Sequence, residues 1–224
     1  VIETVDAKTL FRKVTQAAWE CADPGIQYDD TINDWHTNPE TGRINASNPC
    51  SEYMSLDNSS CNLASLNLMK FLKDDGTCDS RNFVKAVELV ITAMDISICF
   101  ADFPTEPIGE TTRAYRQLGI GYANLGALLM ATGHAYDSRG GQTLAAAITS
   151  LMTGTAYRRS AELAGIVGAY DGFARNADAH ARVMRKHAAA NDAIRPVGAD
   201  DADVLKAATA EWQACLEIGA DFGW

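Results

Sequence analysis

The chain has 224 residues, of which 47% are hydrophobic and 21% are charged. This length can bury one substantial core, so we expect one domain, or part of a larger one, with the composition of an ordinary globular protein. The formal net charge of −10 excludes nucleic acid and anionic membranes as expected partners, because bulk electrostatics disfavours both. The sequence contains neither a long apolar run nor a secretory signal, so we expect no membrane span and a cytoplasmic location.

The N-terminal third is expected to combine a helix, turns and a short strand. Apolar side chains recur at helical spacing over residues 8–22, which predicts an amphipathic helix. Residues 25–35 are expected to form a short strand and a loop. A dense turn signal covers residues 38–42, and the imperfect alternation over residues 63–68 predicts a strand.

The remainder of the chain has helical patterns. Apolar residues predict a helix over 81–99, and the proline-containing stretch at 103–107 ends it. The Ala- and Asp-rich residues 188–203 are expected to include an exposed connection. With so few strands, the chain fits best as part of a larger α/β protein in which helices surround central strands. Further helices are predicted over residues 110–118, 118–132, 138–165, 176–190 and 200–219.

The cysteines and histidines indicate a reducing compartment and no metal centre. The six cysteines form no C-x-x-C pair and no spacing typical of zinc ligands, so most are expected to be small buried side chains. The four histidines form no ligand set either. His180 and His187 are seven residues apart, which more often indicates a solvated helix face than a metal site. The cysteines are Cys21, Cys50, Cys61, Cys78, Cys99 and Cys215.

One loop, with the sequence NPCSE at residues 48–52, combines side chains that can do chemistry together. In an extended backbone, residues two apart project to the same side, so Asn48, Cys50 and Glu52 can face one small substrate. An amide can hold a hydroxyl, a thiol can do redox or radical chemistry, and a carboxylate can move a proton. The alternative is a structural cysteine between two solvated polar groups, which is the commoner meaning of an isolated Asn-x-Cys-x-Glu.

The wider sequence from Thr37 to Leu68 resembles the active-site segment of ribonucleotide reductase large subunits, and it is most similar to the adenosylcobalamin-dependent class. The resemblance rests on the string NPCSEYMSLDNSSCNLASLNL and continues in RQLGIG at residues 116–121, which resembles the start of a family helix. It implies a ten-stranded α/β barrel with the catalytic cysteine on a finger loop at its centre. Residues 1–224 would then be the central part of this barrel, mostly helical with few strands and incomplete at both ends. Its finger-loop region would be 37–68 and its helical region 80–219.

The resemblance also implies the reaction, which is the reduction of ribonucleoside diphosphates to deoxyribonucleotides for DNA synthesis. In the family the initiating radical comes from the cobalt–carbon bond of adenosylcobalamin. Cys50 matches the cysteine whose thiyl radical removes the 3′ hydrogen, at a site shielded from water. Glu52 matches the general base for the 3′ hydroxyl, and Asn48 matches a substrate-binding amide. Without the resemblance, Glu52 would be a solvated carboxylate and Asn48 a turn former before Pro49.

Cys61 matches one member of the redox-active pair that supplies two electrons in the family. The resemblance places its partner upstream of this chain, and the resulting disulfide would be reduced again by a thioredoxin-type reductant. The alternative for Cys61 is a buried strand cysteine. No family role is assigned to the other four cysteines, and we expect them to be structural.

Two alternative functions are open at this point. The first is the large subunit of the di-iron radical class, which uses the same thiol chemistry with a radical delivered from a second subunit. The second is a non-catalytic, truncated helical interaction module that keeps the motif without the reaction. On either reductase reading, the remaining segments of the enzyme are expected partners, and we expect the isolated fragment to be inactive.

Overall fold

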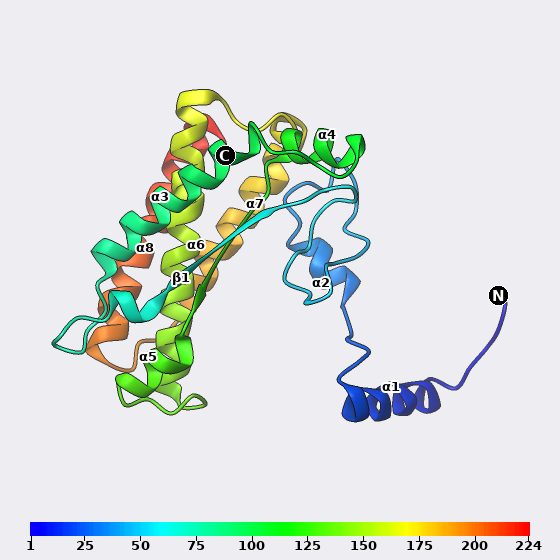
Figure 1. Cartoon of the computed structure of the whole chain (residues 1–224), viewed down its shortest axis with the longest axis horizontal. Helices are drawn as coiled ribbons and strands as arrows, with labels where there is room; N and C mark the ends of the chain where they lie inside the picture. The colour runs from blue at the N-terminus through cyan, green and yellow to red at the C-terminus, as the bar shows by residue number, and fades with distance from the viewer.

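The computed structural model describes residues 1–224, with long helices packed on one side of one short parallel sheet (Figure 1). Most of the helices gather in one body, whereas the first 61 residues form an extended N-terminal part. The elements are α1 (Ala7–Cys21), α2 (Asp29–Asp34), β1 (Asn62–Asn67), the 3-10 helix η1 (Leu68–Phe71), α3 (Ser80–Ile98), α4 (Glu106–Tyr115), β2 (Leu118–Ala123), α5 (Leu125–Ala131), α6 (Arg139–Val167), α7 (Phe173–Ala193) and α8 (Ala199–Phe222).

The helical body, defined as α3, α6, α7 and α8, contains both hydrophobic cores of the molecule. The long helices α6 and α8 make the most extensive contact of any two helices, and α3 packs against α6. A smaller core joins α6, α7 and α8 around Trp212 and Trp224. The larger core takes its buried residues from η1, α3, α5, α6 and α8: Leu68, Phe83, Val87, Ile91, Leu128, Leu129, Leu144, Ala147, Ile148, Leu151, Met152, Val204 and Ala208.

A charged cluster also ties these helices together. The Arg158 side chain on α6 is only 11% exposed and forms ion pairs with Glu88 on α3, Glu162 on α6 and Glu211 on α8. The Nε atom of Arg158 donates to the Glu211 carboxylate at 2.6 Å. A mostly buried guanidinium lowers stability unless its charge is paired. The three carboxylates therefore stabilise the packing of α3 and α8 against α6.

The sheet consists of β1 and β2, which run parallel with Asn62 opposite Leu118 and Asn67 opposite Ala123. One face packs on the helical body, where the Asn62 side-chain amide donates to the Met94 carbonyl oxygen of α3 at 2.8 Å. The other face presents alternate residues, among them Leu63 and Ser65, to a large cleft. The strand predicted at residues 63–68 is therefore confirmed, with bounds shifted by one residue.

The helix predicted over residues 118–132 is confirmed only at 125–131, and the helix start expected at RQLGIG is wrong. These residues form strand β2 followed by helix α5. The reason lies at Gly119, where a Cβ atom would be only 2.4 Å from the Leu63 side chain and 3.3 Å from the Cys61 sulfur. Only glycine, which has no Cβ atom, lets β2 approach β1 this closely. Its presence in the sequence therefore indicates strand contact and not the start of a helix.

Two further connections differ from the expectation. Residues 25–35 contain helix α2 and not a strand, and Asp29 and Asp30 stabilise its N-terminal turn through the helix dipole. The exposed connection expected within residues 188–203 is limited to 194–198, because α7 and α8 extend into this range. The Asp201 carboxylate binds the backbone N–H groups of Val197 and Gly198, which allows α8 to begin early.

Helix α1 matches its predicted range but does not pack on the rest of the molecule. Its N-terminus is capped by Asp6, whose carboxylate accepts a hydrogen bond from the Thr9 N–H at 2.8 Å. No α1 side chain is buried, and Leu10 and Phe11 are 51% and 58% exposed. Figure 1 accordingly shows α1 standing apart near the N-terminus, joined to the molecule by an extended stretch.

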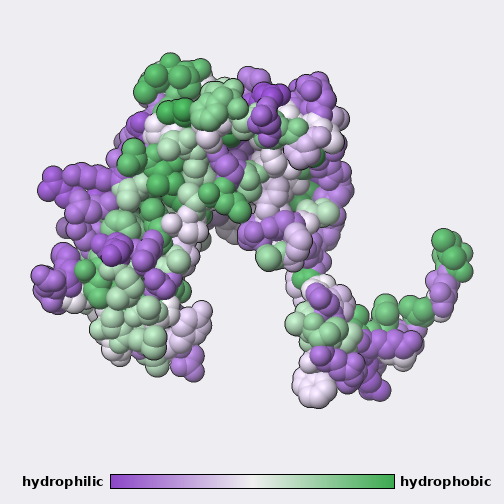
Figure 2. Space-filling view, in the orientation of Figure 1, coloured by the Kyte–Doolittle hydropathy of each residue, from purple (hydrophilic) through white to green (hydrophobic).

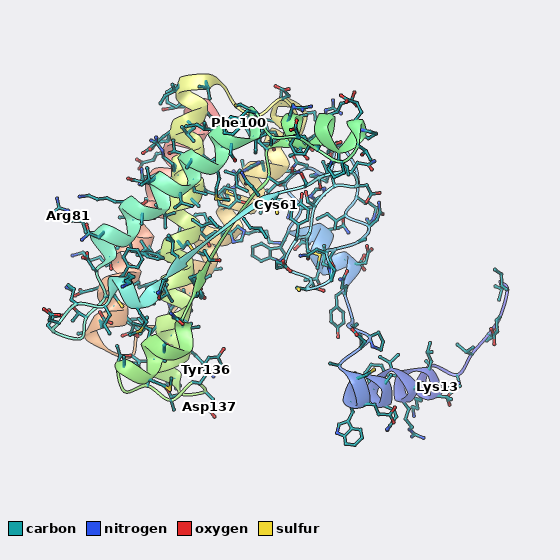
Figure 3. All side chains as sticks on the ribbon, viewed as in Figure 1. Lys13, Cys61, Arg81, Phe100, Tyr136 and Asp137 are labelled. Carbon is teal, nitrogen blue, oxygen red and sulfur yellow. The ribbon has the colours of Figure 1, made fainter.

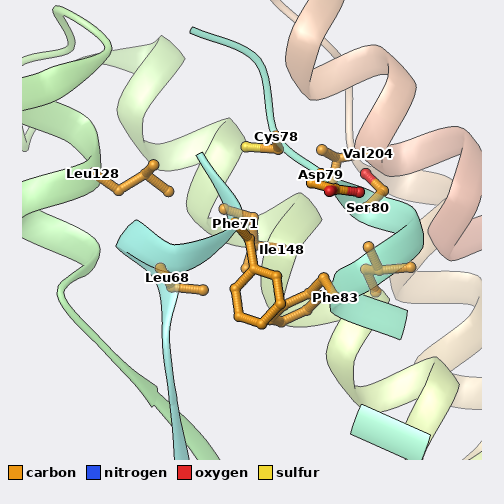
Figure 4. Close-up of a pocket in the computed structure, with 10 residues that line it drawn as sticks. Leu68, Phe71, Cys78, Asp79, Ser80, Phe83, Leu128, Ile148 and Val204 are labelled. Atoms are coloured by element: carbon orange, nitrogen blue, oxygen red, sulfur yellow. The ribbon is translucent and has the colours of Figure 1, made fainter. Parts of the chain in front are cut away.

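A small apolar cavity lies at the end of the body where η1 meets α3, α5, α6 and α8 (Figure 4). Its volume is about 20 Å³, close to that of a single water molecule, and Phe71, Phe83 and Leu128 are among its lining residues. This size fits a packing gap and not a ligand site. None of the helices is both long enough and apolar enough to cross a lipid bilayer.

Candidate functional site

The motif loop, residues 47–54, is a tight reversal and not an extended segment. Ser47 and Met54 form an antiparallel bridge at its base. The Ser51 N–H donates to the Asn48 carbonyl oxygen at 3.0 Å, and Ser51 has a left-handed φ of 64°. This turn breaks the alternation on which the common orientation of Asn48, Cys50 and Glu52 was predicted.

The turn separates Cys50 from its two neighbours. Cys50 is exposed at the loop tip and does not line the large cleft, whereas Asn48 and Glu52 do. The shielding that the resemblance implies for Cys50 in a complete barrel is not provided by residues 1–224, in which Cys50 is exposed. At the tip, Gln27 Nε2 donates a hydrogen bond to Ser51 Oγ at 3.1 Å. Gln27 belongs to the N-terminal part, so this bond does not attach the tip to the helical body.

Asn48 has one polar atom engaged and one free. Its Oδ1 atom accepts a hydrogen bond from the Tyr53 N–H at 3.0 Å, which holds the loop closed. Its amide nitrogen makes no side-chain hydrogen bond and lies beside the cleft. The Asn48 side chain therefore both shapes the loop and offers a donor, as the hypothesis of a substrate-binding amide requires.

Cys61 lies immediately before β1, with its thiol towards the cleft (Figure 3). Its sulfur is close to Gly119 on the neighbouring strand, so the two-strand sheet fixes its position. Burial raises the pKa of the Cys61 thiol, and the nearby Glu52 carboxylate raises it further. The structure therefore brings Asn48, Glu52 and Cys61 to one cleft and leaves Cys50 at its outer edge. Neither Cys50 nor Cys61 forms a disulfide in this chain.

The cleft has a volume of about 920 Å³, near the upper end of the range for small-molecule sites. The space-filling view is hollowed between the helical body and the N-terminal part (Figure 2). The strands form one wall, and α6 and α7 form another. Two buried acceptors in its lining have no partner: Gln117 Oε1 and His180 Nε2. A buried acceptor without a partner is costly, so both atoms favour a ligand or chain segment that carries N–H or O–H groups.

The two histidines of α7 are not on a solvated face, as the spacing suggested, but in the wall of this cleft. His180 is 5% exposed and stacks on Trp224, with ring centroids 4.9 Å apart. His187 stacks on Trp212 at 5.6 Å. Burial lowers the pKa of His180 to about 4 and also lowers the pKa of His187, so both rings are neutral near pH 7.

Hydrogen bonding fixes the tautomer of His180. The Tyr170 hydroxyl donates its one proton to Asn38 Oδ1 at 2.8 Å. The 3.0 Å contact between Tyr170 and His180 Nδ1 must then be donated by the histidine. Nε2 is left as an unprotonated acceptor. The sequence could not reveal this role, because Trp224 and Asn38 are distant from His180 along the chain. The structure contains no group of three or more His, Cys, Asp or Glu side chains arranged to hold a metal ion.

Comparison with known proteins agrees with the resemblance. The family model described as the ribonucleotide reductase barrel domain matches residues 1–224. A vitamin B12-dependent ribonucleotide reductase of Streptomyces avermitilis is 70% identical over all of this chain and 24% of its own length. Its counterpart in Rhodopirellula baltica is 47% identical over 97% of this chain and 21% of its own length.

A more distant relative also matches. The vitamin B12-dependent ribonucleoside-diphosphate reductase of Mycobacterium tuberculosis is 35% identical over 77% of this chain and 25% of its own length. The chain thus spans about a quarter of the length of the curated relatives it matches. The predicted fold class, a mostly helical piece of an α/β barrel, is confirmed by the family match. The chain belongs to the ribonucleotide reductase barrel domain family.

Proposed function

We propose that residues 1–224 are the central part of the catalytic barrel of an adenosylcobalamin-dependent ribonucleoside-diphosphate reductase. The finger-loop region is 37–68 and the helical region is 80–219. The names of the most similar relatives support the cobalamin class over the di-iron class. The observation that carries the proposal is the convergence of Asn48, Glu52 and Cys61 on one cleft, with Cys50 at its edge.

Cys50 is the proposed radical residue. As a thiyl radical, its sulfur takes the hydrogen atom from C3′ of a bound ribonucleotide, so that an S–H bond forms and a C–H bond breaks. When bound, adenosylcobalamin supplies the initiating radical through its cobalt–carbon bond. In the complete barrel, other chain segments are expected to cover the exposed loop tip and exclude water and oxidants from Cys50.

Glu52 and Asn48 are proposed to act on the ribose hydroxyls. The Glu52 carboxylate takes the proton of the 3′ hydroxyl, which assists departure of the 2′ hydroxyl as water. The free amide nitrogen of Asn48 donates to a substrate hydroxyl and holds the ribose in place. Both side chains line the same cleft, so a single bound ribose can meet them together.

Cys61 is proposed to supply electrons for the reduction. Replacement of the 2′ hydroxyl by hydrogen, with release of water, requires two electrons and two protons. Cys61 and a second thiol deliver both as they form a disulfide. A thioredoxin-type reductant then restores the dithiol by thiol–disulfide exchange. The raised pKa of Cys61 keeps its sulfur protonated near neutral pH, so it can also provide hydrogen.

The unpartnered acceptors of the cleft fit the proposed ligands. A ribonucleotide and the adenosyl group both carry ribose hydroxyls, and many bases carry N–H groups. Gln117 Oε1 and His180 Nε2 are buried acceptors without partners in the same cleft. These two side chains would accept hydrogen bonds from such groups, in addition to the proposed contacts of Asn48 and Glu52.

The test is Cys50→Ser in the full-length reductase that carries this segment. The substitution keeps the volume but replaces a weak S–H bond with a strong O–H bond, so we expect no deoxynucleotide product and nearly unchanged substrate binding. Cys21→Ser is the matched control, because Cys21 is also exposed but lies on the separate helix α1. Turnover by the Cys50→Ser enzyme above background would contradict the proposal.

We also propose that the isolated 224-residue chain is inactive and that the enzyme is cytoplasmic.

A further inference from the structure

The backbone just before the motif loop is held by α7, which lies more than 130 residues later in the sequence. The anchoring turn, residues 38–42, closes on itself through hydrogen bonds from Thr41 N and Gly42 N to the Asn38 carbonyl oxygen. The side chains that fix this turn come mainly from α7 and the residues just before it, with one more from the end of α4. We propose that Asn176 of α7 is a positioning residue that sets the N-terminal base of the loop carrying Cys50. This inference rests on the proposed function, because it gives that loop a catalytic role.

Asn176 binds the anchoring turn with its whole side-chain amide. Its Oδ1 atom accepts the Glu40 N–H at 2.9 Å. Its Nδ2 atom donates to Thr41 Oγ1 at 2.8 Å and to the Gly172 carbonyl oxygen at 2.9 Å. The side chain is 0% exposed, so no water can replace these partners. Loss of the amide would remove the acceptor of the Glu40 N–H and the donor to Thr41.

Two tyrosines extend this attachment on either side of Asn176. The Tyr170 hydroxyl donates to Asn38 Oδ1 at 2.8 Å and is itself held by His180. The Tyr115 hydroxyl and Thr41 Oγ1 are 2.7 Å apart. Upstream, Arg182 and Lys186 of α7 form ion pairs with Asp34. The contacts follow the chain from residue 34 to residue 41, so α7 fixes a continuous stretch and not a single point.

The C-terminal base of the loop is held separately. Ser60 donates its N–H to Thr112 Oγ1 of α4 at 3.0 Å, and Gln117 Nε2 donates to Ser55 Oγ at 3.0 Å. The C-terminal base thus depends on α4 and on Gln117, which precedes β2. The N-terminal base depends mainly on α7 and Tyr170, with one contact from Tyr115 at the end of α4. Displacement at either base moves the tip, and displacement of a reacting atom by about 1 Å can reduce a rate about 100-fold. A defect at α7 should therefore lower kcat more than it raises KM.

The same helix offers a matched control. Asn191 is also a buried asparagine of α7, being 2% exposed, and its amide bonds Ser150 on α6 and Thr209 on α8. Asn191→Ala removes a comparable buried amide without touching the anchoring turn. Asn176→Ala and Asn191→Ala in the full-length reductase thus separate positioning of the loop from general loss of stability.

We expect Asn176→Ala to lower kcat at least about tenfold, with a smaller change in KM for a ribonucleoside diphosphate. Asn191→Ala should keep kcat within about threefold at a temperature where both variants are folded. Hydrogen–deuterium exchange should speed up at Glu40 and Thr41 in Asn176→Ala only. Equal loss of kcat in both variants, or unchanged kcat in Asn176→Ala, would overturn the inference.

Tyr170→Phe provides a second test if Asn176→Ala does not fold. It keeps the ring but removes the hydroxyl that binds Asn38, so we expect faster exchange around residues 38–42 and a several-fold lower kcat. Unchanged exchange and kcat would overturn the inference. A Cys50→Ser enzyme measured alongside distinguishes the two proposals. Its residual turnover would disprove the role of Cys50, whereas the exchange measurement still reports whether α7 holds the turn.

Discussion

The helical body and the N-terminal part of the chain are held by different forces. Of the first 61 residues only His36, Asn38, Ile44 and Leu56 are buried, whereas α6 alone contributes ten buried residues. The body is stabilised by apolar burial between long helices. The segments on either side of the motif loop are held by hydrogen bonds from α7, from α4 and from Gln117, which precedes β2. Stability therefore depends mainly on the apolar core, whereas the position of the loop depends on a few polar side chains.

This separation explains why the site is incomplete around Cys50 while the helices are well packed. A packed helical body can form from one quarter of the relatives' length, because its buried faces all come from within the chain. The loop tip has no such internal partner, and Cys50 is exposed. Changes in the loop should thus alter reaction steps with little effect on stability, whereas changes in the apolar core of the body should mainly alter stability.

The largest expected effect of this kind is at Cys61. In the full-length reductase, Cys61→Ser should reduce steady-state turnover with a thioredoxin-type reductant by at least about 100-fold, because one electron donor is missing. Hydrogen exchange between substrate and solvent through Cys50 should persist, and the thermal midpoint should change little, because Cys61 is only partly buried. Deoxynucleotide formation and tritium exchange are the two measurements. Normal steady-state turnover would show that Cys61 is merely structural.

The next effect is on stability and concerns the body. Leu151→Ala on α6 removes a side chain that is 1% exposed, so it should lower the free energy of unfolding by about 2–5 kcal/mol. Leu89→Ala is the matched control on α3, because Leu89 is 71% exposed and should cost less than about 0.5 kcal/mol. Urea unfolding of the chain measures both. Similar losses in the two variants would mean that the packing described for α6 is wrong.

The third prediction concerns the pH dependence of stability and the residue His180, which lines the cleft between the two regions. Burial places the pKa of His180 at about 4 in the folded chain, below its ordinary value of 6.5. The unfolded chain therefore binds this proton more readily, so stability is complete above pH 6.5 and declines as the pH falls towards 4. The loss from His180 should approach roughly 3 kcal/mol by pH 4.

The measurement is urea unfolding of the wild-type chain and of His180→Phe between pH 7 and pH 4.5. The variant should show a shallower decline, whatever its stability at pH 7. Some decline should persist, because burial also lowers the pKa of His36 and of His187. Parallel pH profiles for the two proteins would show that His180 takes up a proton as easily in the folded chain as in the unfolded one.

The two regions also differ in what could be predicted from the sequence. Helices of the body follow from apolar periodicity, since residues such as Phe83, Val87 and Ile91 recur on the face of α3 that becomes buried. The helix predicted over 118–132 was wrong at 118–123 because Gly119 and Gly121 are determined by strand β1, more than 50 residues away. The local sequence pattern contains no information about the close contact between β1 and β2.

The candidate site shows the same division. The motif identified Asn48, Glu52 and Cys61, which do share a cleft, although their catalytic roles stay predictions. The orientation of Cys50 was not predictable from alternation, because a single left-handed residue, Ser51, reverses the chain. Gln117 was not predicted as a site residue, and His180 was expected on a solvated helix face. Their unpartnered acceptors become visible only when distant elements are brought together around the cleft.

The smallest effect should be at α1, the most exposed element of the N-terminal part. Its apolar face includes Leu10 and Phe11, yet no side chain of the helix is buried. The double substitution Leu10→Ser and Phe11→Ser should therefore change the free energy of unfolding of the 224-residue chain by less than about 0.5 kcal/mol, because it removes no packed contact. Urea unfolding followed by tryptophan fluorescence measures this, since Trp212 and Trp224 report on the core of the body. A loss above about 1 kcal/mol would mean that α1 packs on the chain in solution. The contrast between a body held by burial and an N-terminal part held by hydrogen bonds would then not extend to α1.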